Sequence, residues 1–499
     1  MECGRLENGI ARYLPLFTNP EKSNNAGFRG GSYGGVSYGG GGSITGLELT
    51  VGSCEETLSF STDTSYEITT SDDMEVVSIS SKTIYGVMYG MESLSQLIEH
   101  DTKNNQLLLT NVSPSLKISD QPNYNHRGLM LDTGRRFIPM SSLKSQIDAM
   151  AMNKLNVLHF HFADYCRFAI NLPKYPELTN GLDDEQAGVY QVQDIRELIF
   201  YANERGVRVV PEVDMPGHSN WGVNLGLVTG GLKYCTDVFP TSLYDDPDGI
   251  TVNTLKGILT EVVELFGGEE LFHVGADETS SSDGEGCTIE NIAGLENKIF
   301  QHLVSLGKTP VGWEEVFFVS NGADGFQGGK SIINDWSKYH PPETIDAGFD
   351  AIESYSAKFY LNNFPKVSDL WYDISTGLEI DKTKPTVNLK GGEISMWTDN
   401  YCDVAQCGAF NTTSKPVGSE LYPPETNTAF TQSLAGMIWP LSSVGSAAFW
   451  NYDKTLTSEE LQQKLDGVSR RFLERGVDAC PSGCICDEVS RCGVKYLDM

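Results

Sequence analysis

The feature that most constrains this chain is a repeated alternation of short apolar segments with helical segments, which begins after residue 126. Eight segments have the composition of buried strands: 128–134, 156–164, 208–214, 271–278, 308–316, 331–336, 350–356 and 391–397. Apolar residues at helical spacing follow most of them; Leu143, Ile147, Met150 and Ala151, for example, are spaced i, i+4, i+7 and i+8. Repeated strand–helix units predict a parallel sheet, and eight units predict a closed (β/α)8 TIM barrel of the α/β class.

A doubly wound open sheet is the alternative interpretation of the same alternation. Such a sheet carries a glycine-rich phosphate-binding turn after its first strand. Here the first predicted strand runs into Asp132-Thr133-Gly134-Arg135, which is not a turn of that kind. The barrel is therefore the preferred prediction.

The chain before the barrel has a different pattern. Short β-type runs occur between residues 46 and 80, and a helix follows with Tyr85, Met88, Met91, Leu94 and Ile98 near one face. The glycine-rich stretch 28–43 offers little to pack, so we predict a mobile loop there and no phosphate cradle. The polar segment 121–126 marks a boundary. We expect a small α+β domain over 1–121, followed over 122–499 by the barrel and a cysteine-rich C-terminal tail.

The charge balance limits the partners of this protein. Lys and Arg number 36 against 67 Asp and Glu, which gives a formal net charge of −31. Binding to nucleic acid or to an anionic membrane surface needs clustered basic residues, which this balance argues against. No run approaches the ~20 apolar residues of a membrane-spanning helix. We therefore expect no nucleic-acid partner and no membrane span.

The compartment is inferred from cysteines and glycosylation motifs. Residues 1–14 include acidic side chains and no long apolar run, so no signal peptide is visible. Eleven cysteines favour an oxidising compartment. Asn111 and Asn411 lie in glycosylation sequons, although Pro114 weakens the first. We expect a lysosomal or secreted glycoprotein with disulfide bonds, whose leader is missing from this sequence.

Polar and aromatic residues occur where the predicted strands end, whereas the strand bodies read as apolar. Active sites of (β/α)8 barrels lie at the C-terminal ends of the strands. The residues at these ends are Asp132, Arg135, Asp164, Asp214, His218, Asp277, Glu278, Trp313, Glu314, Glu315, Trp336, Trp397 and Asp399. Carboxylates among indoles suit a neutral ligand with hydroxyls and apolar faces, such as a sugar. The alternative role for Arg135 is neutralisation of Asp132.

The adjacent acids Asp277 and Glu278 are the most informative pair. Neighbours in a continuing strand point to opposite faces, so both can serve one pocket only if the strand stops there. The polar segment that starts at Thr279 indicates that it does. Two close carboxylates cannot both ionise freely, so one pKa rises and provides an acid at neutral pH. Cleavage of a glycosidic bond needs that division of roles.

Seven segments, in order, resemble the β-N-acetylhexosaminidases, family 20 of the glycoside hydrolases, and the likeness spans nearly the whole chain. The segments are HRGLMLDTGRR (126–136), KLNVLHFHFAD (154–164), VRVVPEVDMPGHSNWG (207–222), LFHVGADE (271–278), GWEEV (312–316), SAKFYLNN (356–363) and GGEISMW (391–397). Residues 84–98 also resemble the helix of that family's small N-terminal domain. The resemblance implies a retaining, substrate-assisted hydrolase without cofactor or metal, with a terminal β-linked N-acetylhexosamine on a glycan as substrate, and a homodimer.

The same resemblance implies a role for each site residue. Glu278 protonates the leaving oxygen and later deprotonates water, and Asp277 orients the substrate's acetamido group, which acts as the nucleophile. Asp164 and His218 form a relay behind Glu278. The remaining contacts with the sugar come from Arg135, Trp313, Trp336, Tyr360, Trp397 and Asp399.

Two other functions remain as alternatives. His159-x-His161 on a barrel strand is compatible with a metal-dependent amidohydrolase, because residues i and i+2 point the same way. That class needs further histidines near later strands, of which this sequence has few. A non-catalytic sugar-binding barrel is the second alternative, and the intact acid Glu278 argues against it.

The cysteines allow several pairings. Cys3 and Cys54 are candidates within the first domain, and Cys402 and Cys407 are close enough in sequence for a local bridge. The tail resembles a disulfide knot, with zinc as the lesser alternative; its cysteines are Cys480, Cys484, Cys486 and Cys492. The family resemblance implies a pair between Cys235 and Cys287. Because eleven is odd, at least one thiol is free or intermolecular.

Overall fold

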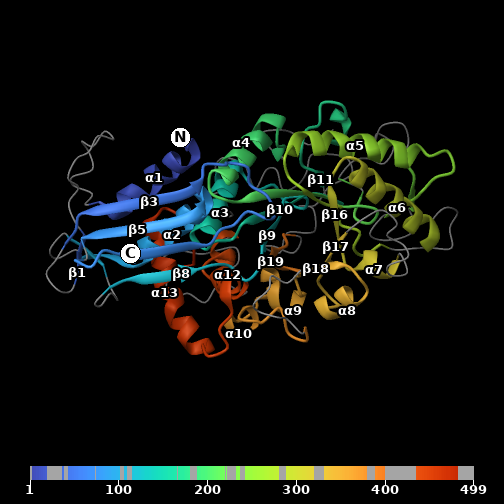
Figure 1. Ribbon diagram of the computed structural model, residues 1–499. Helices are drawn as coiled ribbons and strands as arrows, with labels where there is room; N and C mark the ends of the chain where they lie inside the picture. The colour runs from blue at the N-terminus through green and yellow to red at the C-terminus, as the bar shows by residue number, and fades with distance from the viewer. Residues whose placement is uncertain are drawn as a thin grey trace, which may run out of the picture. The chain divides into compact units, whose positions relative to one another are not determined.

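The computed structural model describes most of the chain in two compact units (Figure 1). One unit comprises Met1–Asn123 with Asn203–Gly206, and the other comprises Tyr124–Ala202 with Val207–Met499. The described residues are 3–18, 36–38, 43–73, 75–101, 106–109, 115–165, 167–179, 188–219, 221, 232–235, 242–279, 288–319, 331–378, 388–398 and 434–480.

The second unit is built around a closed barrel of eight parallel strands, so the predicted (β/α)8 fold is confirmed. The strands are β9 (His126–Asp132), β10 (Val157–Asp164), β12 (Arg208–Val213), β15 (Leu271–His273), β16 (Thr309–Trp313), β17 (Ile332–Asp335), β18 (Asp350–Glu353) and β19 (Leu389–Met396). The barrel closes because β9 pairs with both β10 and β19: Gly128 lies opposite Val157 on one side and Glu393 on the other. Each of the eight strands is one of the segments predicted from the sequence.

Helices follow the strands, as the periodicity predicts, but they shorten along the chain. The first four are α3 (Met140–Met152), α4 (Val192–Asn203), α5 (Ile250–Phe266) and α6 (Ile289–Ser305). The next are α7 (Glu315–Val319), α8 (Pro341–Asp346), α9 (Ser356–Phe359) and α10 (Val367–Leu370), with α12 (Ser442–Asn451) and α13 (Ser458–Glu474) after β19. Smaller elements are β11 (Arg167–Phe168), β13 (Tyr234–Cys235), β14 (Ser242–Leu243) and the 3-10 turns Pro176–Thr179 and Leu361–Asn363. None of the helices in the described part of the chain is long and apolar enough to cross a membrane.

Strand β10 shows how the sequence positions the site. Its outward residues Leu158, Phe160 and Phe162 are fully buried in the large apolar core that the helices share. The alternate residues His159 and His161 point to the other face, into the barrel. The strand therefore needs apolar residues toward the helices and can carry polar ones inside.

The first unit contains two four-stranded sheets. One has the order β3 (Gly46–Ser53), β5 (Val76–Thr83), β4 (Tyr66–Thr70), β8 (Lys117–Asp120), and the other β2 (Ser43–Ile44), β1 (Val36–Tyr38), β7 (Gln106–Leu109), β6 (Ile98–Asp101). Its helices are α1 (Gly4–Phe17) and α2 (Ile84–Gln96), so Ile98 begins a strand instead of extending the predicted helix. The Cys3–Cys54 disulfide forms as expected.

The glycine-rich stretch 28–43 differs from its prediction at one place. Val36–Tyr38 form strand β1, which pairs with β7 and β2, so these three residues are not loop. Val36 and Tyr38 alternate around Ser37, which suits a strand despite the surrounding glycines. Residues 28–35 and 39–42 lie outside the described part.

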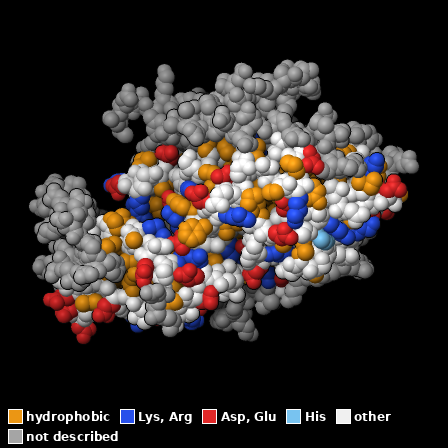
Figure 2. All heavy atoms as spheres, turned by 90° about the horizontal axis from the view of Figure 1, so that it is seen from above, with side chains coloured by type: hydrophobic (Ala, Val, Ile, Leu, Met, Phe, Trp, Pro, Cys, Tyr) orange, Lys and Arg blue, Asp and Glu red, His pale blue; other side chains and the backbone are white. Residues whose placement is uncertain are grey.

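Figure 2 shows one face of the molecule. Basic and acidic side chains are interspersed among apolar ones over the described residues seen there. The excess negative charge of the chain is therefore not gathered into one acidic surface on this face.

Candidate active site

The two adjacent acids lie just beyond the C-terminal end of β15, where the backbone leaves the sheet. The strand ends at His273, earlier than predicted, because Gly275, Ala276 and Glu278 take positive φ values of 69°, 69° and 45°. Left-handed residues bend the chain out of the pleat, so consecutive side chains no longer alternate. Asp277 is 8% exposed, whereas the Glu278 side chain is 56% exposed. One acid is thus held inside the barrel mouth, and the other faces solvent.

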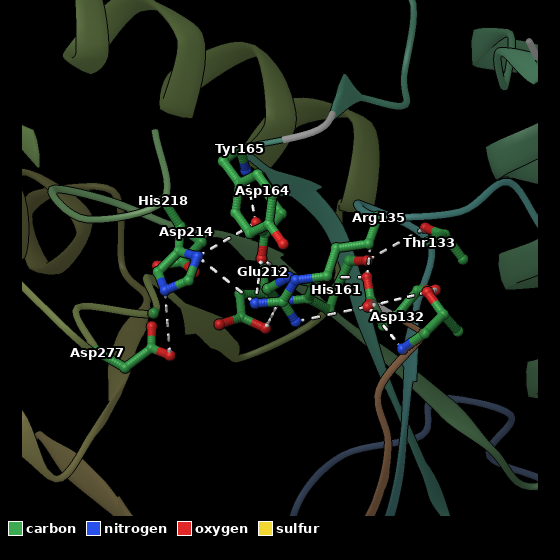
Figure 3. Close-up of polar contacts among 12 residues, drawn as sticks. Asp132, Thr133, Arg135, His161, Asp164, Tyr165, Glu212, Asp214, His218 and Asp277 are labelled. Atoms are coloured by element: carbon green, nitrogen blue, oxygen red, sulfur yellow. Dashed lines mark hydrogen bonds and ion pairs between the residues drawn. The ribbon is translucent and has the colours of Figure 1, made fainter. Parts of the chain in front are cut away.

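His218 connects these acids to the barrel interior (Figure 3). Its Nε2 lies 3.2 Å from a Glu278 carboxylate oxygen and 4.0 Å from Asp277. Its Nδ1 lies 3.3 Å from Asp164 Oδ1. The structure therefore brings together the four residues Asp164, His218, Asp277 and Glu278, which lie far apart in the sequence.

Arg135 lies beside this group and contacts both of its acidic neighbours. Its guanidinium is 3.1 Å from Asp164 and 3.5 Å from Asp132, and it stands 4.6 Å above the Trp397 ring. Asp132 also accepts hydrogen bonds from the Thr398 backbone N–H and hydroxyl, each at 3.0 Å. Arg135 therefore takes the alternative role predicted for it, neutralisation of Asp132. The same guanidinium also contacts Asp164 and the Trp397 ring.

The aromatic residues form a cluster of their own. Trp313, Tyr360 and Trp397 are buried together, and Trp336 packs against them. Trp336 stacks on Tyr360 with ring centroids 6.1 Å apart and 7° between the planes. Trp397 lies 5.8 Å from Trp313 and 5.9 Å from Tyr360. Asp399, the last predicted contact, lies outside the described residues.

The raised pKa in the acid pair belongs to Asp277 and not to Glu278. Burial raises the pKa of Asp277, and neighbouring carboxylates add to the effect against the opposing influence of His218. The hydrogen bond from His218 lowers the pKa of Glu278 in the ligand-free chain. The pKa of His218 rises to about 10, since Asp164 and Asp277 outweigh the effect of its burial. The proton between His218 and Glu278 therefore resides on His218 when no ligand is bound.

The strand bodies are not apolar, which corrects the sequence prediction. Their inward positions carry a buried set of contacts between histidines and acids, formed by His126, His159, His161, Glu212, His273 and Glu393. Glu212 is the centre, because His159, His161 and His273 approach it at 2.8, 2.5 and 3.1 Å, and Trp313 donates its indole N–H at 3.0 Å. The period of two along β10 and β12 could have indicated these inward residues.

Two further acids at the strand ends, to which the sequence assigns no role, lie near the aromatic cluster and the acid pair. Glu315 accepts the Trp336 indole N–H at 2.9 Å, and burial with the charge of Asp277 raises its pKa to about 8. Asp214 is fully buried next to Gly275, where an added Cβ would lie 1.9 Å from its Oδ1. Burial and Asp277 raise the pKa of Asp214 well above its ordinary value. Glycine at 275 thus leaves space for that carboxyl.

The histidines of the amidohydrolase alternative are engaged with carboxylates. His159, Glu212 and His273 have ligand atoms within 4.8 Å of one another, which is close enough for a metal site. His159 is bridged between Glu212 and Glu393 at 2.8 Å on each side, and its ring lies 4.4 Å from that of His273. These contacts account for the two histidines as partners of buried acids.

The residue that follows Asp164 also lies beside the site. Tyr165 follows Asp164 and packs its ring 5.5 Å from the ring of His218, while the Arg135 guanidinium lies 5.4 Å above the Tyr165 ring.

The cysteine predictions are tested only in part. Cys235 and Cys480 each take part in a disulfide bond. Cys287, Cys402, Cys407 and the other tail cysteines lie outside the described residues, as do both sequons.

A buried acid, an exposed acid on a histidine relay and a wall of indoles at the mouth of a (β/α)8 barrel define a glycoside hydrolase site. Comparisons with known proteins agree. The model of "Glycosyl hydrolase family 20, catalytic domain" matches residues 124–407, and that of "beta-acetyl hexosaminidase like" matches residues 10–97.

Three similar proteins illustrate the relationship. The β-hexosaminidase subunit B2 of Dictyostelium discoideum is 31% identical over 427 residues, which cover 79% of this chain and 72% of the relative. The β-hexosaminidase 1 of Arabidopsis thaliana is 30% identical over 469 residues, covering 88% and 78%. The solved structure of a Flavobacterium johnsoniae chitobiase aligns with a TM-score of 0.69 at 22% identity, over 95% of this chain and 68% of that one. The chain belongs to glycoside hydrolase family 20.

Proposed function

We propose that this enzyme releases terminal, non-reducing β-linked N-acetylhexosamine, GlcNAc or GalNAc, from glycans or chitooligosaccharides. Family membership and the names of its relatives support this activity. The observation that carries the proposal is the geometry after β15, where Asp277 is buried and Glu278 is exposed beside the same histidine. A pair of acids with such different surroundings can take two different roles.

Glu278 is the general acid and base. Its exposed carboxyl can reach a glycosidic oxygen, and bound substrate would exclude water from it and favour its protonated form. In the first step the proton of the His218–Glu278 pair passes to the leaving oxygen as the glycosidic bond breaks. In the second step Glu278 takes a proton from the attacking water, so the pair returns to its starting state.

Asp277 serves the nucleophile, which is the acetamido oxygen of the substrate itself. That oxygen attacks the anomeric carbon and forms an oxazolinium ring, which water opens with retention of configuration. Asp277 accepts the acetamido N–H and stabilises the positive charge that develops on the ring. The Tyr360 hydroxyl donates to the acetamido oxygen, and Trp313 and Trp397 enclose the methyl group, supported by the compact aromatic cluster.

The remaining contacts fix the sugar ring. Arg135 holds ring hydroxyls from its position between Asp164 and Trp397, Trp336 covers a sugar face, and Asp399 takes O4 and O6. No cofactor or metal takes part in this scheme. We also propose a lysosomal or secreted location and a homodimer; the Cys3–Cys54 disulfide supports an oxidising compartment.

The test compares wild type, Glu278→Gln and Asp277→Asn on 4-nitrophenyl β-GlcNAc, with a thiazoline analogue of the cyclised intermediate as inhibitor. We expect kcat to fall by about 10²–10⁴-fold in Glu278→Gln and by about 10²–10³-fold in Asp277→Asn. The thiazoline should inhibit the wild type competitively and lose affinity for Asp277→Asn. Near-full activity in either variant would remove its assigned role, and an inactive wild type would favour a non-catalytic sugar-binding barrel.

A further inference from the structure

The site continues into the barrel through His161 and Glu212, which the proposed reaction does not use. Both side chains are fully buried. His161 Nδ1 lies 2.5 Å from Glu212 Oε2, and its Nε2 lies 2.8 Å from Asp164 Oδ2 (Figure 3). His161 thus bridges two buried carboxylates that come from different strands.

These contacts extend the relay behind the acid into one continuous chain. The chain runs Glu212, His161, Asp164, His218 and Glu278, with successive separations of 2.5, 2.8, 3.3 and 3.2 Å. Acids and histidines alternate along it, from the barrel interior to the exposed end. Each member therefore has opposite charges as neighbours when all five groups are ionised.

The ionisation states follow from the surroundings. His161 lies between two carboxylates that overcome its burial, so its pKa is raised well above the ordinary value. Burial opposes ionisation of Glu212, but three histidines lower its pKa well below the usual range. Arg135 and His218 likewise lower the pKa of Asp164 against its burial. Because the interior is shielded from water, these charges act on one another with little screening.

We propose that His161 and Glu212 are positioning residues for acid catalysis: Glu212 holds His161 in its protonated form, and the His161 cation offsets the charge of Asp164 and keeps the proton available to Glu278. This inference rests on the proposed role of Glu278. Without a cation at position 161, the Asp164 carboxylate would attract the proton more strongly to His218. Protonated His218 stabilises the Glu278 carboxylate, so Glu278 becomes a weaker source of protons.

Other charged and aromatic groups also face His161, Glu212 and His218 and influence their pKa values. His161 also faces Asp132 at 4.0 Å, and its ring packs against Trp397 at 5.0 Å. Glu212 is faced by His159 and His273 besides His161. His218 is faced by Asp277 and by Arg135, whose nearest nitrogen is 3.5 Å away. A substitution at 161 also removes the contacts of His161 with Asp132 and Trp397, but it leaves in place the other groups that face Glu212 and His218.

The test uses a ratio that is independent of how much enzyme is correctly folded. We would measure kcat/KM of the full chain for two aryl β-GlcNAc substrates, one with 4-nitrophenol and one with 4-methylphenol as leaving group. The second needs protonation far more. In His161→Asn the 4-methylphenyl to 4-nitrophenyl ratio should fall about tenfold, and the alkaline limb of the pH profile should move to lower pH. Glu212→Gln removes the carboxylate that does most to keep His161 protonated, so through the loss of that cation it should change both in the same direction.

His126→Asn is the matched control, because His126 is an equally buried histidine that pairs with Glu393 at 3.1 Å. It should leave the ratio and the alkaline limb at their wild-type values even if it destabilises the protein. Equal ratios in wild type, His161→Asn and Glu212→Gln would overturn the inference and leave the role of Glu278 intact. If Glu278→Gln itself kept the wild-type ratio, the proposed function would fail first.

Discussion

The mouth of the barrel has two unlike halves. The charged half consists of β9, β10, β12, β15 and the loops after them, and it supplies Arg135, Asp164, His218, Asp277 and Glu278. The aromatic half consists of β16 to β19 with their loops, and it supplies Trp313, Trp336, Tyr360 and Trp397. The halves meet where β15 pairs with β16 and where β19 pairs with β9.

This division teaches how one barrel can both move a proton and hold a neutral ring. In the charged half, every described acid of the relay has an arginine or histidine nitrogen within 4.0 Å. These contacts set the pKa values of the acids and histidines between which the proton moves. In the aromatic half, packed rings form an apolar cluster without a carboxylate of the relay, which we propose holds the neutral sugar ring. If the halves divide the labour, substitutions in the relay of the charged half should lower kcat, and substitutions in the aromatic half should raise KM. Arg135, which we propose holds ring hydroxyls, is the exception in the charged half.

The largest expected effect in this comparison is that of His218→Asn. The variant removes the link between Asp164 and Glu278, so kcat on 4-nitrophenyl β-GlcNAc should fall about 10²-fold. KM should change little, because His218 is buried behind the acids. Steady-state kinetics at several pH values would check this. A raised KM with unchanged kcat would mean that His218 contributes to substrate binding and not to proton transfer.

Tyr360→Phe should lower kcat about tenfold although it lies in the aromatic half. Its hydroxyl is the exception there, since we expect it to contact the acetamido oxygen as that atom attacks. Burial raises the pKa of Tyr360 well above its ordinary value, so the hydroxyl stays protonated throughout the assay range. The pH profile of the variant should therefore keep its wild-type shape, and a shifted limb would count against this role.

Trp336→Phe should raise KM about fivefold and change kcat less. The smaller ring loses area over the sugar and the hydrogen bond to Glu315, effects of about 1 kcal/mol. Binding of the product GlcNAc, measured by calorimetry, should weaken by a similar factor. A change confined to kcat would break the proposed division.

The smallest effect concerns Glu315, the acid at the edge of the aromatic half. Burial and Asp277 raise its pKa to about 8, above the ~4.3 of an unfolded chain. The folded state thus retains a proton that the unfolded state releases, so this contribution to stability is complete below pH ~4.3 and is lost as pH rises to about 8. Glu315→Gln cannot lose that proton.

Thermal unfolding at pH 5 and pH 8 would check this. Glu315→Gln should lose less stability between the two values than wild type, whereas the exposed Glu343→Gln should behave like wild type. An equal loss in all three proteins would show that Glu315 does not hold its proton in the folded state.

The sequence predicts the barrel well, because strand and helix periodicity is local. All eight strands lie where apolar runs end in polar residues, and the N-terminal elements around α2 follow their patterns. The end of the strand that carries Asp277 and Glu278 was predicted too late, since three left-handed residues are not visible in composition.

The buried ion pairs were harder to predict. The sequence predicts that His159 and His161 point the same way, but it suggests a metal as their partner. Glu212 lies in a segment whose composition predicts an apolar strand. The reason is physical: the partners come from β10, β12, β15 and β19, and only barrel closure brings them together. Register across the barrel is a property of the whole sheet, which single segments do not reveal.

The bend formed by Gly275, Ala276 and Glu278 has a consequence for engineering. Transplanting the two acids onto a regular strand of another barrel would aim one of them at the helices, so the residues alone would not transfer the activity. The portable unit is the contorted segment 275–278 together with Asp214, which occupies the room that Gly275 leaves. A design that copies the two acidic residues without the left-handed backbone would have both carboxyl groups, but they would not point into the same site.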